Sequence, residues 1–307
     1  MTATRNAFDG AARSRWRERL DRGEVLLLDG GTGSELRRRG FPMRDDVWSA
    51  AASVTHFDLL RAVHEDYVRA GADAIIANTF AGTRFVLAAG GLGGRFEEIN
   101  RRAVAAAMEA RAGAGRAVAV AGSLSCLPPR FDPARYPAPA AEARAYRELA
   151  ELLAACGVDA IALEMLEETR HAPLACEAAR ATGLPFWLGV SCRLDRGRLV
   201  AFDFPDVTLD QCLDALLPYA PAVVNVMHTP PDAVLPALEL IRARWRGPLG
   251  VYPELGSAPG PAGGGPALPP AGFAAAARAW VAAGARLVGG CCGTTPEHIA
   301  ALRDLRR

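Results

Sequence analysis

The hydrophobic positions of this 307-residue chain gather in eight short and nearly continuous apolar runs. Runs of this kind are typical of strands that are buried on both faces of a parallel sheet. The runs cover residues 25–29, 73–78, 117–123, 158–164, 186–191, 222–226, 248–252 and 286–290.

Between these runs the hydrophobic positions recur with the spacing of one helix face. The amphipathic stretches are residues 57–70, 96–112, 140–156, 169–182, 209–219, 232–245 and 273–283. Pro296 and Glu297 open a further short helix. Eight repeats of strand and helix predict an α/β protein with the (β/α)8 TIM-barrel architecture. We expect a single domain over residues 1–307, with an N-terminal helical extension at 1–24 that closes the barrel bottom and a Gly- and Pro-rich loop at 257–270.

The composition narrows the class of protein. Half of the residues are hydrophobic and the net charge is only +1, so neither a nucleic acid nor an anionic membrane is an expected partner. All basic residues are arginines, which excludes a catalytic lysine. Seven cysteines, an odd number, are scattered through the chain and indicate a reducing compartment. No apolar run resembles a signal peptide or a membrane span, so we expect a cytoplasmic location.

Polar side chains stand at the ends of most of the predicted strands. They are Asp29, Asn78, Ser123, Glu164, Ser191, Asn225, Glu254 and the pair Cys291 and Cys292. In a TIM barrel the carboxyl ends of the strands carry the chemistry. Acids, amides and two thiols around one opening suit an amino-acid-like ligand that contains sulfur.

The adjacent cysteines Cys291 and Cys292 are the strongest chemical signal in the chain. They follow a short apolar run and are flanked by glycines, which let the backbone bend. Two thiolates at a strand end favour a soft metal ion such as zinc. The alternative is a pair of buried structural cysteines without a metal, or a vicinal disulfide.

Several short motifs occur in order along nearly the whole chain. They are Leu28-Asp29-Gly30-Gly31-Thr32-Gly33-Ser34-Glu35-Leu36, Val47-Trp48-Ser49-Ala50, His64-Glu65-Asp66-Tyr67, Ala70-Gly71-Ala72-Asp73, Asn78-Thr79-Phe80, Leu163-Glu164, Val251-Tyr252-Pro253 and Gly289-Gly290-Cys291-Cys292-Gly293-Thr294. Through these motifs the chain resembles the homocysteine S-methyltransferase family. The resemblance implies a TIM barrel in which zinc activates homocysteine for methylation to methionine. It also implies that Cys291 and Cys292 bind zinc and that Asp29 and Glu164 hold the substrate amino group.

The third zinc cysteine of this family has no counterpart here. It would follow Asn225, which matches the family and is a candidate catalytic residue, but the next residue is Val226. His228 is the candidate replacement, since residues 226 and 228 of a continuing strand share a side. We therefore expect a site of two cysteines and one histidine, with Met227 pointing away from it into packing. The alternative is that His228 is a rim residue without a metal.

The candidate substrate-binding residues include four further side chains. The resemblance implies that Trp48 contacts the methyl donor, and an aromatic face suits a sulfonium or ammonium group. Asn78 and Phe80 match the family branch that uses S-methylmethionine or S-adenosylmethionine rather than betaine. Glu254 replaces the usual asparagine of the family and adds an acid near the opening.

Three hypotheses follow for the function. The leading one is a zinc-dependent S-methyltransferase that moves a methyl group from S-methylmethionine or S-adenosylmethionine to homocysteine, or to a related thiol or selenol. The second is a metal-dependent hydrolase or lyase on the same barrel, with zinc-bound water as the nucleophile. The third is a family member that has lost catalysis and serves in binding or regulation. In the first two cases the partners are small molecules.

Overall fold

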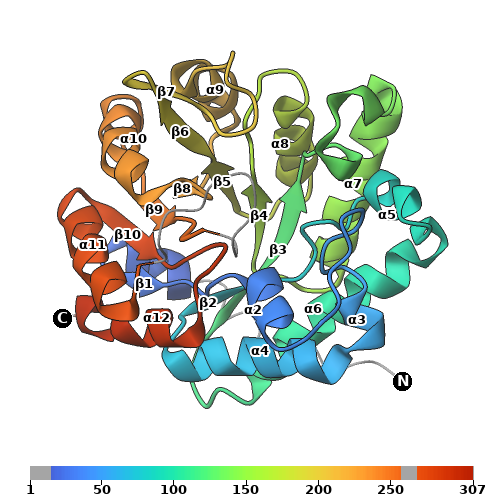
Figure 1. Ribbon diagram of the computed structural model, residues 1–307, viewed down its shortest axis with the longest axis horizontal. Coiled ribbons are helices and arrows are strands. Elements are labelled where there is room, and N and C mark those ends of the chain that lie inside the picture. The colour runs from blue at the N-terminus through green and yellow to red at the C-terminus, as the bar shows by residue number, and fades with distance from the viewer. Residues whose placement is uncertain (1–14, 257–267, 307) are drawn as a thin grey trace.

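The computed structural model describes residues 15–256 and 268–306. Eight parallel strands form the sheet, and they match the eight apolar runs (Figure 1). They are β1 (Leu26–Leu27), β2 (Ala74–Ala77), β3 (Ala119–Ser125), β4 (Ala160–Glu164), β5 (Phe186–Val190), β8 (Val223–Met227), β9 (Leu249–Tyr252) and β10 (Ala285–Val288).

The sheet closes on itself, which confirms the predicted TIM barrel. The strand order is β1-β10-β9-β8-β5-β4-β3-β2, and a parallel bridge between Leu28 and Ala74 joins the two ends. The backbone N–H of Asp29 donates to the carbonyl of Ala74 at 3.1 Å across the same seam. Residues 257–267 of the expected Gly- and Pro-rich loop, and residues 1–14 of the expected extension, lie outside the described residues.

Helices surround the barrel (Figure 1). Those that the amphipathic stretches predict are α4 (Phe57–Ala70), α6 (Phe96–Ala112), α7 (Pro139–Ala155), α8 (Ala172–Ala181), α9 (Leu209–Leu216), α10 (Pro231–Arg244), α11 (Pro270–Ala282) and α12 (Pro296–Ala301). Three short helices were not expected, namely α2 (Thr32–Arg38), α3 (Ala52–Thr55) and α5 (Arg84–Ala89). None of the helices in the described part of the chain meets the length and hydropathy that crossing a bilayer requires.

Alternate residues of each strand enter two different cores. In β8 the side chain of Val224 packs into the layer between sheet and helices, whereas Val223 packs inside the barrel. The two-residue period of a strand produces this division. Residues 15–21 are helical, and Trp16 from this segment enters the inner core, where its ring meets Trp187 edge-on at 5.4 Å.

A two-stranded antiparallel hairpin follows β5 and interrupts the strand–helix alternation. It consists of β6 (Cys192–Asp195) and β7 (Arg198–Ala201), and it contacts α9 and α10 outside the ring of strands (Figure 1). Its turn contains Arg196 and Gly197, both with positive φ. The hairpin was not predicted from the sequence, because its residues are partly polar and carry no continuous apolar run.

Candidate active site

A cavity of about 450 Å³ opens at the carboxyl ends of the strands. The predicted site residues that line it are Asp29, Trp48, Asn78, Phe80, Glu164, His228, Glu254, Cys291 and Cys292. Asn225 is fully buried and does not reach the cavity surface. Residues from all parts of the sequence therefore meet at the carboxyl ends of the barrel strands.

Three donor atoms of the metal-ligating type converge on one side of this cavity. The Sγ of Cys291 lies 3.5 Å from the Nδ1 of His228 and 3.9 Å from the Sγ of Cys292. All three donor atoms lie within 4.8 Å of one another, and the side chains are half-buried. These are the three residues that the sequence suggests as metal ligands, and the structure brings them together in a group that can hold a metal ion.

The predicted orientation of Val226 and Met227 is wrong. Val226 continues the regular strand and packs into the outer core against the helices, whereas Met227 lies in the inner core and lines the cavity. The strand ends at Met227, and His228 turns away with a φ of 43°. A left-handed backbone at a residue other than glycine costs roughly 1–3 kcal/mol. It is this turn, and not a shared strand side, that brings His228 to the cysteines.

The loop that carries the two cysteines is fastened to the first strand of the barrel. The Gly290 N–H donates to the Asp29 carbonyl at 3.0 Å, and the Gly31 N–H donates to the Thr294 hydroxyl at 3.0 Å. That hydroxyl donates in turn to the Cys291 carbonyl at 2.6 Å. Gly293 has a φ of 81°, a conformation that favours glycine. The backbone of both cysteines is therefore fixed before any ligand binds.

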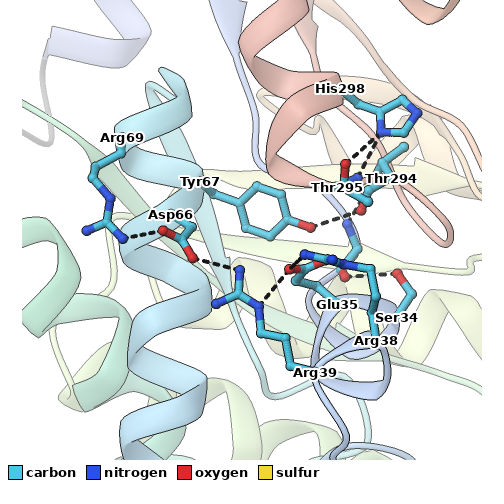
Figure 2. A network of polar contacts seen from close by, with 11 residues as sticks. Ser34, Glu35, Arg38, Arg39, Asp66, Tyr67, Arg69, Thr294, Thr295 and His298 are labelled. Carbon is cyan, nitrogen blue, oxygen red and sulfur yellow. Dashed lines mark hydrogen bonds and ion pairs between the residues drawn. The ribbon is translucent and has the colours of Figure 1, made fainter. Parts of the chain in front are cut away.

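A polar network below this loop supports it from α2 and α4 (Figure 2). The Tyr67 hydroxyl of α4 donates to the Thr294 carbonyl at 3.0 Å in the protein interior. The buried carboxylate of Glu35 on α2 accepts from Arg38 and from Arg39, and Arg39 also bonds Asp66 of α4 at 2.7 Å. The resemblance motifs contain Glu35, Asp66 and Tyr67, and the structure gives them this supporting position.

The thiols of the pair differ in acidity when no metal is bound. The hydrogen bond from Cys291, together with the charge of the His228 ring, lowers the pKa of Cys292 well below its usual value. The same hydrogen bond and burial raise the pKa of Cys291. Burial alone would disfavour the charged ring, but the Cys292 thiolate raises the pKa of His228 to about 9. Of the two thiols, Cys292 is therefore the one whose lowered pKa favours the thiolate form.

We predict that Cys292 is the most reactive cysteine of the metal-free protein. A thiolate reacts with iodoacetamide and a thiol does not, so Cys292 should react at least about tenfold faster than buried Cys176, whose pKa is raised to about 12 by burial. Mass spectrometry of peptides over a time course measures both rates, and added zinc should protect Cys292. Equal rates at Cys291 and Cys292 would contradict the assigned thiolate.

Two buried carboxyl groups line the cavity. Asp29, 2% exposed, accepts a hydrogen bond from the Ile76 N–H at 2.8 Å, and Glu164 accepts one from the Ser123 hydroxyl. Burial, with the charge of Glu164, raises the pKa of Asp29, and burial with the Cys292 charge raises the pKa of Glu164 to about 7. No arginine is among the described residues that line the cavity, and the charge of the His228 ring offsets the burial of Glu164 only in part.

Trp48 and Asn78 form one unit at the cavity wall. Asn78 uses its side-chain oxygen to accept from the Ser49 hydroxyl at 2.6 Å and its amide to donate to the Ser49 carbonyl at 2.9 Å. Trp48 has a φ of 51°, and the Arg37 guanidinium lies over its ring at 5.6 Å. Asn78 thus fixes the segment that presents Trp48, while Phe80 lines the cavity nearby.

Sequence reasoning missed some residues of the cavity wall. Phe202 and Asp203, which follow β7, and Met165 also line the cavity. Phe202 meets the His228 ring edge-on, with ring centres 4.9 Å apart. No strand-end signal marks Phe202 and Asp203, because they directly follow the inserted hairpin and not a strand of the barrel.

Comparison with known proteins agrees with this geometry. The model of the homocysteine S-methyltransferase family matches residues 26–305. The homocysteine S-methyltransferase of Escherichia coli strain K12 is 31% identical over 312 residues, which cover 92% of this chain and 96% of the relative. A selenocysteine methyltransferase of Astragalus bisulcatus is 27% identical, with 90% of this chain and 91% of the relative covered.

A solved structure shares the fold. The metallated form of the homocysteine methyltransferase MmuM from Escherichia coli superposes with a TM-score of 0.77 at 29% identity, over 94% of this chain and 98% of that one. The barrel and its relatives define a methyltransferase. More closely, the chain belongs to the homocysteine S-methyltransferase family.

Proposed function

We propose that this protein is a zinc-dependent S-methyltransferase that moves a methyl group from a sulfonium donor to homocysteine, or to a related thiol or selenol, with methionine as the product from homocysteine. The observation that carries the proposal is the convergence of Cys291, Cys292 and His228 on one cavity with two buried carboxyl groups. The names of the relatives, which include acceptors with sulfur and with selenium, support this choice of acceptors.

The three donor atoms fit a zinc ion. With Zn–S of about 2.3 Å and Zn–N of about 2.0 Å, neighbouring ligand atoms of a tetrahedral site lie roughly 3.5–3.8 Å apart. The separations of 3.5 Å and 3.9 Å are close to these values. Bound there with one open position, zinc would hold the acceptor sulfur and lower the pKa of its thiol. A structure of a metallated relative also favours a metal in this family.

The buried acids suit the ammonium group of the acceptor. In the proposed complex Asp29 and Glu164 face this ammonium, which would stabilise both ionised carboxylates. Asn225 lies below the cavity with neither amide atom in a hydrogen bond among the described residues. We propose that Asn225 supports the cavity beneath the acceptor, since an unpaired buried amide favours a polar partner.

A second part of the cavity lining suits a cationic donor. It contains the aromatic rings of Trp48 and Phe80 and the acids Glu254 and Asp203. S-methylmethionine and S-adenosylmethionine both carry a sulfonium, and we propose one of them as the donor. The acceptor sulfur attacks the methyl carbon while the carbon–sulfur bond of the sulfonium breaks. The electron pair of that bond stays on the departing sulfur, so the leaving group is a neutral thioether. The residues contribute by aligning the two sulfur atoms with the methyl carbon.

Acceptor binding should depend on pH through Glu164. The pKa of this carboxyl is about 7 in the free protein, so below pH 7 it is mostly protonated and lacks the charge that pairs with an ammonium. We therefore predict that kcat/KM for homocysteine rises with pH through about 7. The Glu164→Gln variant should lack this dependence when both proteins are assayed from pH 5.5 to 8.5. A rise of the same size in the variant would assign the titration to another group.

Metal analysis and a methyl-transfer assay test the proposal together. Protein purified under reducing conditions without chelators should contain about one zinc per chain and convert homocysteine to methionine with one of the two sulfonium donors. The family match does not favour the hydrolase or lyase alternative. Zinc without turnover of any thiol or selenol acceptor would support a family member that has lost catalysis, and absence of zinc would contradict the metal site. The cytoplasmic location stays a prediction.

A further inference from the structure

The backbone of His228 is held from three sides in an unusual conformation. Its φ of 43° is left-handed, a conformation that is uncommon for residues other than glycine. The His228 N–H donates to the Tyr252 carbonyl of β9 at 3.1 Å, and the His228 carbonyl accepts from the Ser191 hydroxyl at 3.0 Å. Next along the chain, the Thr229 hydroxyl donates to the Met227 carbonyl at 2.8 Å. The turn is therefore fixed by both neighbouring strands.

The inserted hairpin contacts the ring as well as the backbone. The edge-to-face pair of Phe202 and His228 has an interplanar angle of 67°, a favoured arrangement of aromatic rings. Phe202 is tied to the base of the hairpin, because its N–H donates to the Ser191 carbonyl at 3.3 Å. The Cys192 N–H at the start of β6 donates to the Thr229 hydroxyl at 3.1 Å. The N–H of Asp203, which follows Phe202 in the chain, donates to the buried Glu167 carboxylate at 2.7 Å.

We propose that the β6–β7 hairpin and the residues on either side of it position His228 as a metal ligand, with Ser191 fixing its backbone and Phe202 fixing its ring. This inference rests on the proposed zinc site. Neither residue contacts the cysteines in the described hydrogen bonds and ring contacts, so both are positioning residues. A histidine that already faces Cys291 loses little side-chain freedom when a metal binds. Substitution of residues that hold metal ligands in place commonly weakens metal binding by tenfold to a hundredfold.

Zinc affinity of matched variants tests the proposal. Competition with a chromogenic chelator should show that Ser191→Ala and Phe202→Leu each weaken zinc binding by about tenfold or more. Phe202→Tyr keeps the aromatic edge and should bind zinc within about threefold of the original protein. Leu194→Ala changes an exposed residue of the same hairpin, 39% exposed, and should leave zinc affinity unchanged.

A double-mutant cycle with His228→Ala separates positioning from general loosening. If Phe202 acts through the imidazole, then Phe202→Leu has no further effect on zinc affinity once His228 is alanine. An equal loss of affinity in both backgrounds would overturn the proposal while leaving the proposed zinc site intact. Unchanged zinc affinity in His228→Ala alone would instead show that the proposed ligand set is wrong. Thermal unfolding of each variant verifies that the barrel is folded.

Discussion

Replacing Cys291 or Cys292 by serine should abolish stoichiometric zinc binding and lower kcat/KM for homocysteine by at least about a thousandfold. Each substitution removes a thiolate and leaves a hydroxyl, which binds zinc poorly at neutral pH. A catalytic metal lowers the activation free energy by several kcal/mol. Roughly 1.4 kcal/mol corresponds to a factor of ten in rate. Both effects should appear together, because the metal is proposed to hold the reacting sulfur.

Metal analysis and steady-state kinetics on the same preparations measure these two effects. Cys156→Ser is the matched control, since Cys156 is half-buried at the end of α7, where its sulfur contacts Arg101 far from the cavity lining. It should retain zinc and activity. A serine variant at position 291 or 292 that keeps full zinc content and full activity would contradict the assigned site.

Glu164→Gln and Asp29→Asn should each raise KM for homocysteine by roughly tenfold or more. Each change would remove one of the two proposed charged contacts with the ammonium of the acceptor while keeping nearly the same shape. A tenfold change corresponds to about 1.4 kcal/mol. Because both residues lie 8% or less exposed, water cannot readily replace the lost contact. KM for the sulfonium donor should change little, since the donor is proposed to occupy the wall with Trp48.

Initial rates at saturating concentrations of one substrate and varied concentrations of the other separate the two KM values. Methylation of a thiol without an amino group gives a further control. The rate of this reaction should be the same in Glu164→Gln as in the original protein. If homocysteine kinetics are unchanged in both variants, the ammonium is held elsewhere.

The barrel could be predicted from the sequence because its signal is simple. Strands buried on both faces leave continuous apolar runs, and parallel strands require helical crossovers, so runs such as 158–164 and 186–191 lead directly to the closed sheet. The short helix α2 was missed, because it begins with Thr32-Gly33-Ser34, residues that favour turns as much as helix. The hairpin after β5 was missed because nothing in the barrel pattern requires it.

The site could be predicted as a set of residues but not as a geometry. The position of Cys291, Cys292 and His228 followed from strand ends and from the resemblance. The reason given for His228 was wrong, since the expected register assumed a regular strand through residue 228. The left-handed backbone of His228 changes which side chain faces the cavity. This conformation is held by hydrogen bonds to Ser191 and Tyr252, which are distant in sequence. Contacts of this kind carry no local signal.

The seam between β1 and β10 has a consequence for the order of events during folding. The hydrogen bonds that fasten the cysteine loop to the first strand join residues 263 and 259 positions apart, as between Gly31 and Thr294 or Ser34 and Gly293. Such distant contacts form late, because the chain must first pay the entropy of closing a very long loop. A nascent chain therefore cannot assemble the thiol pair beside Asp29 until its last strand docks. Metal uptake should then report completion of the barrel rather than an early folding step.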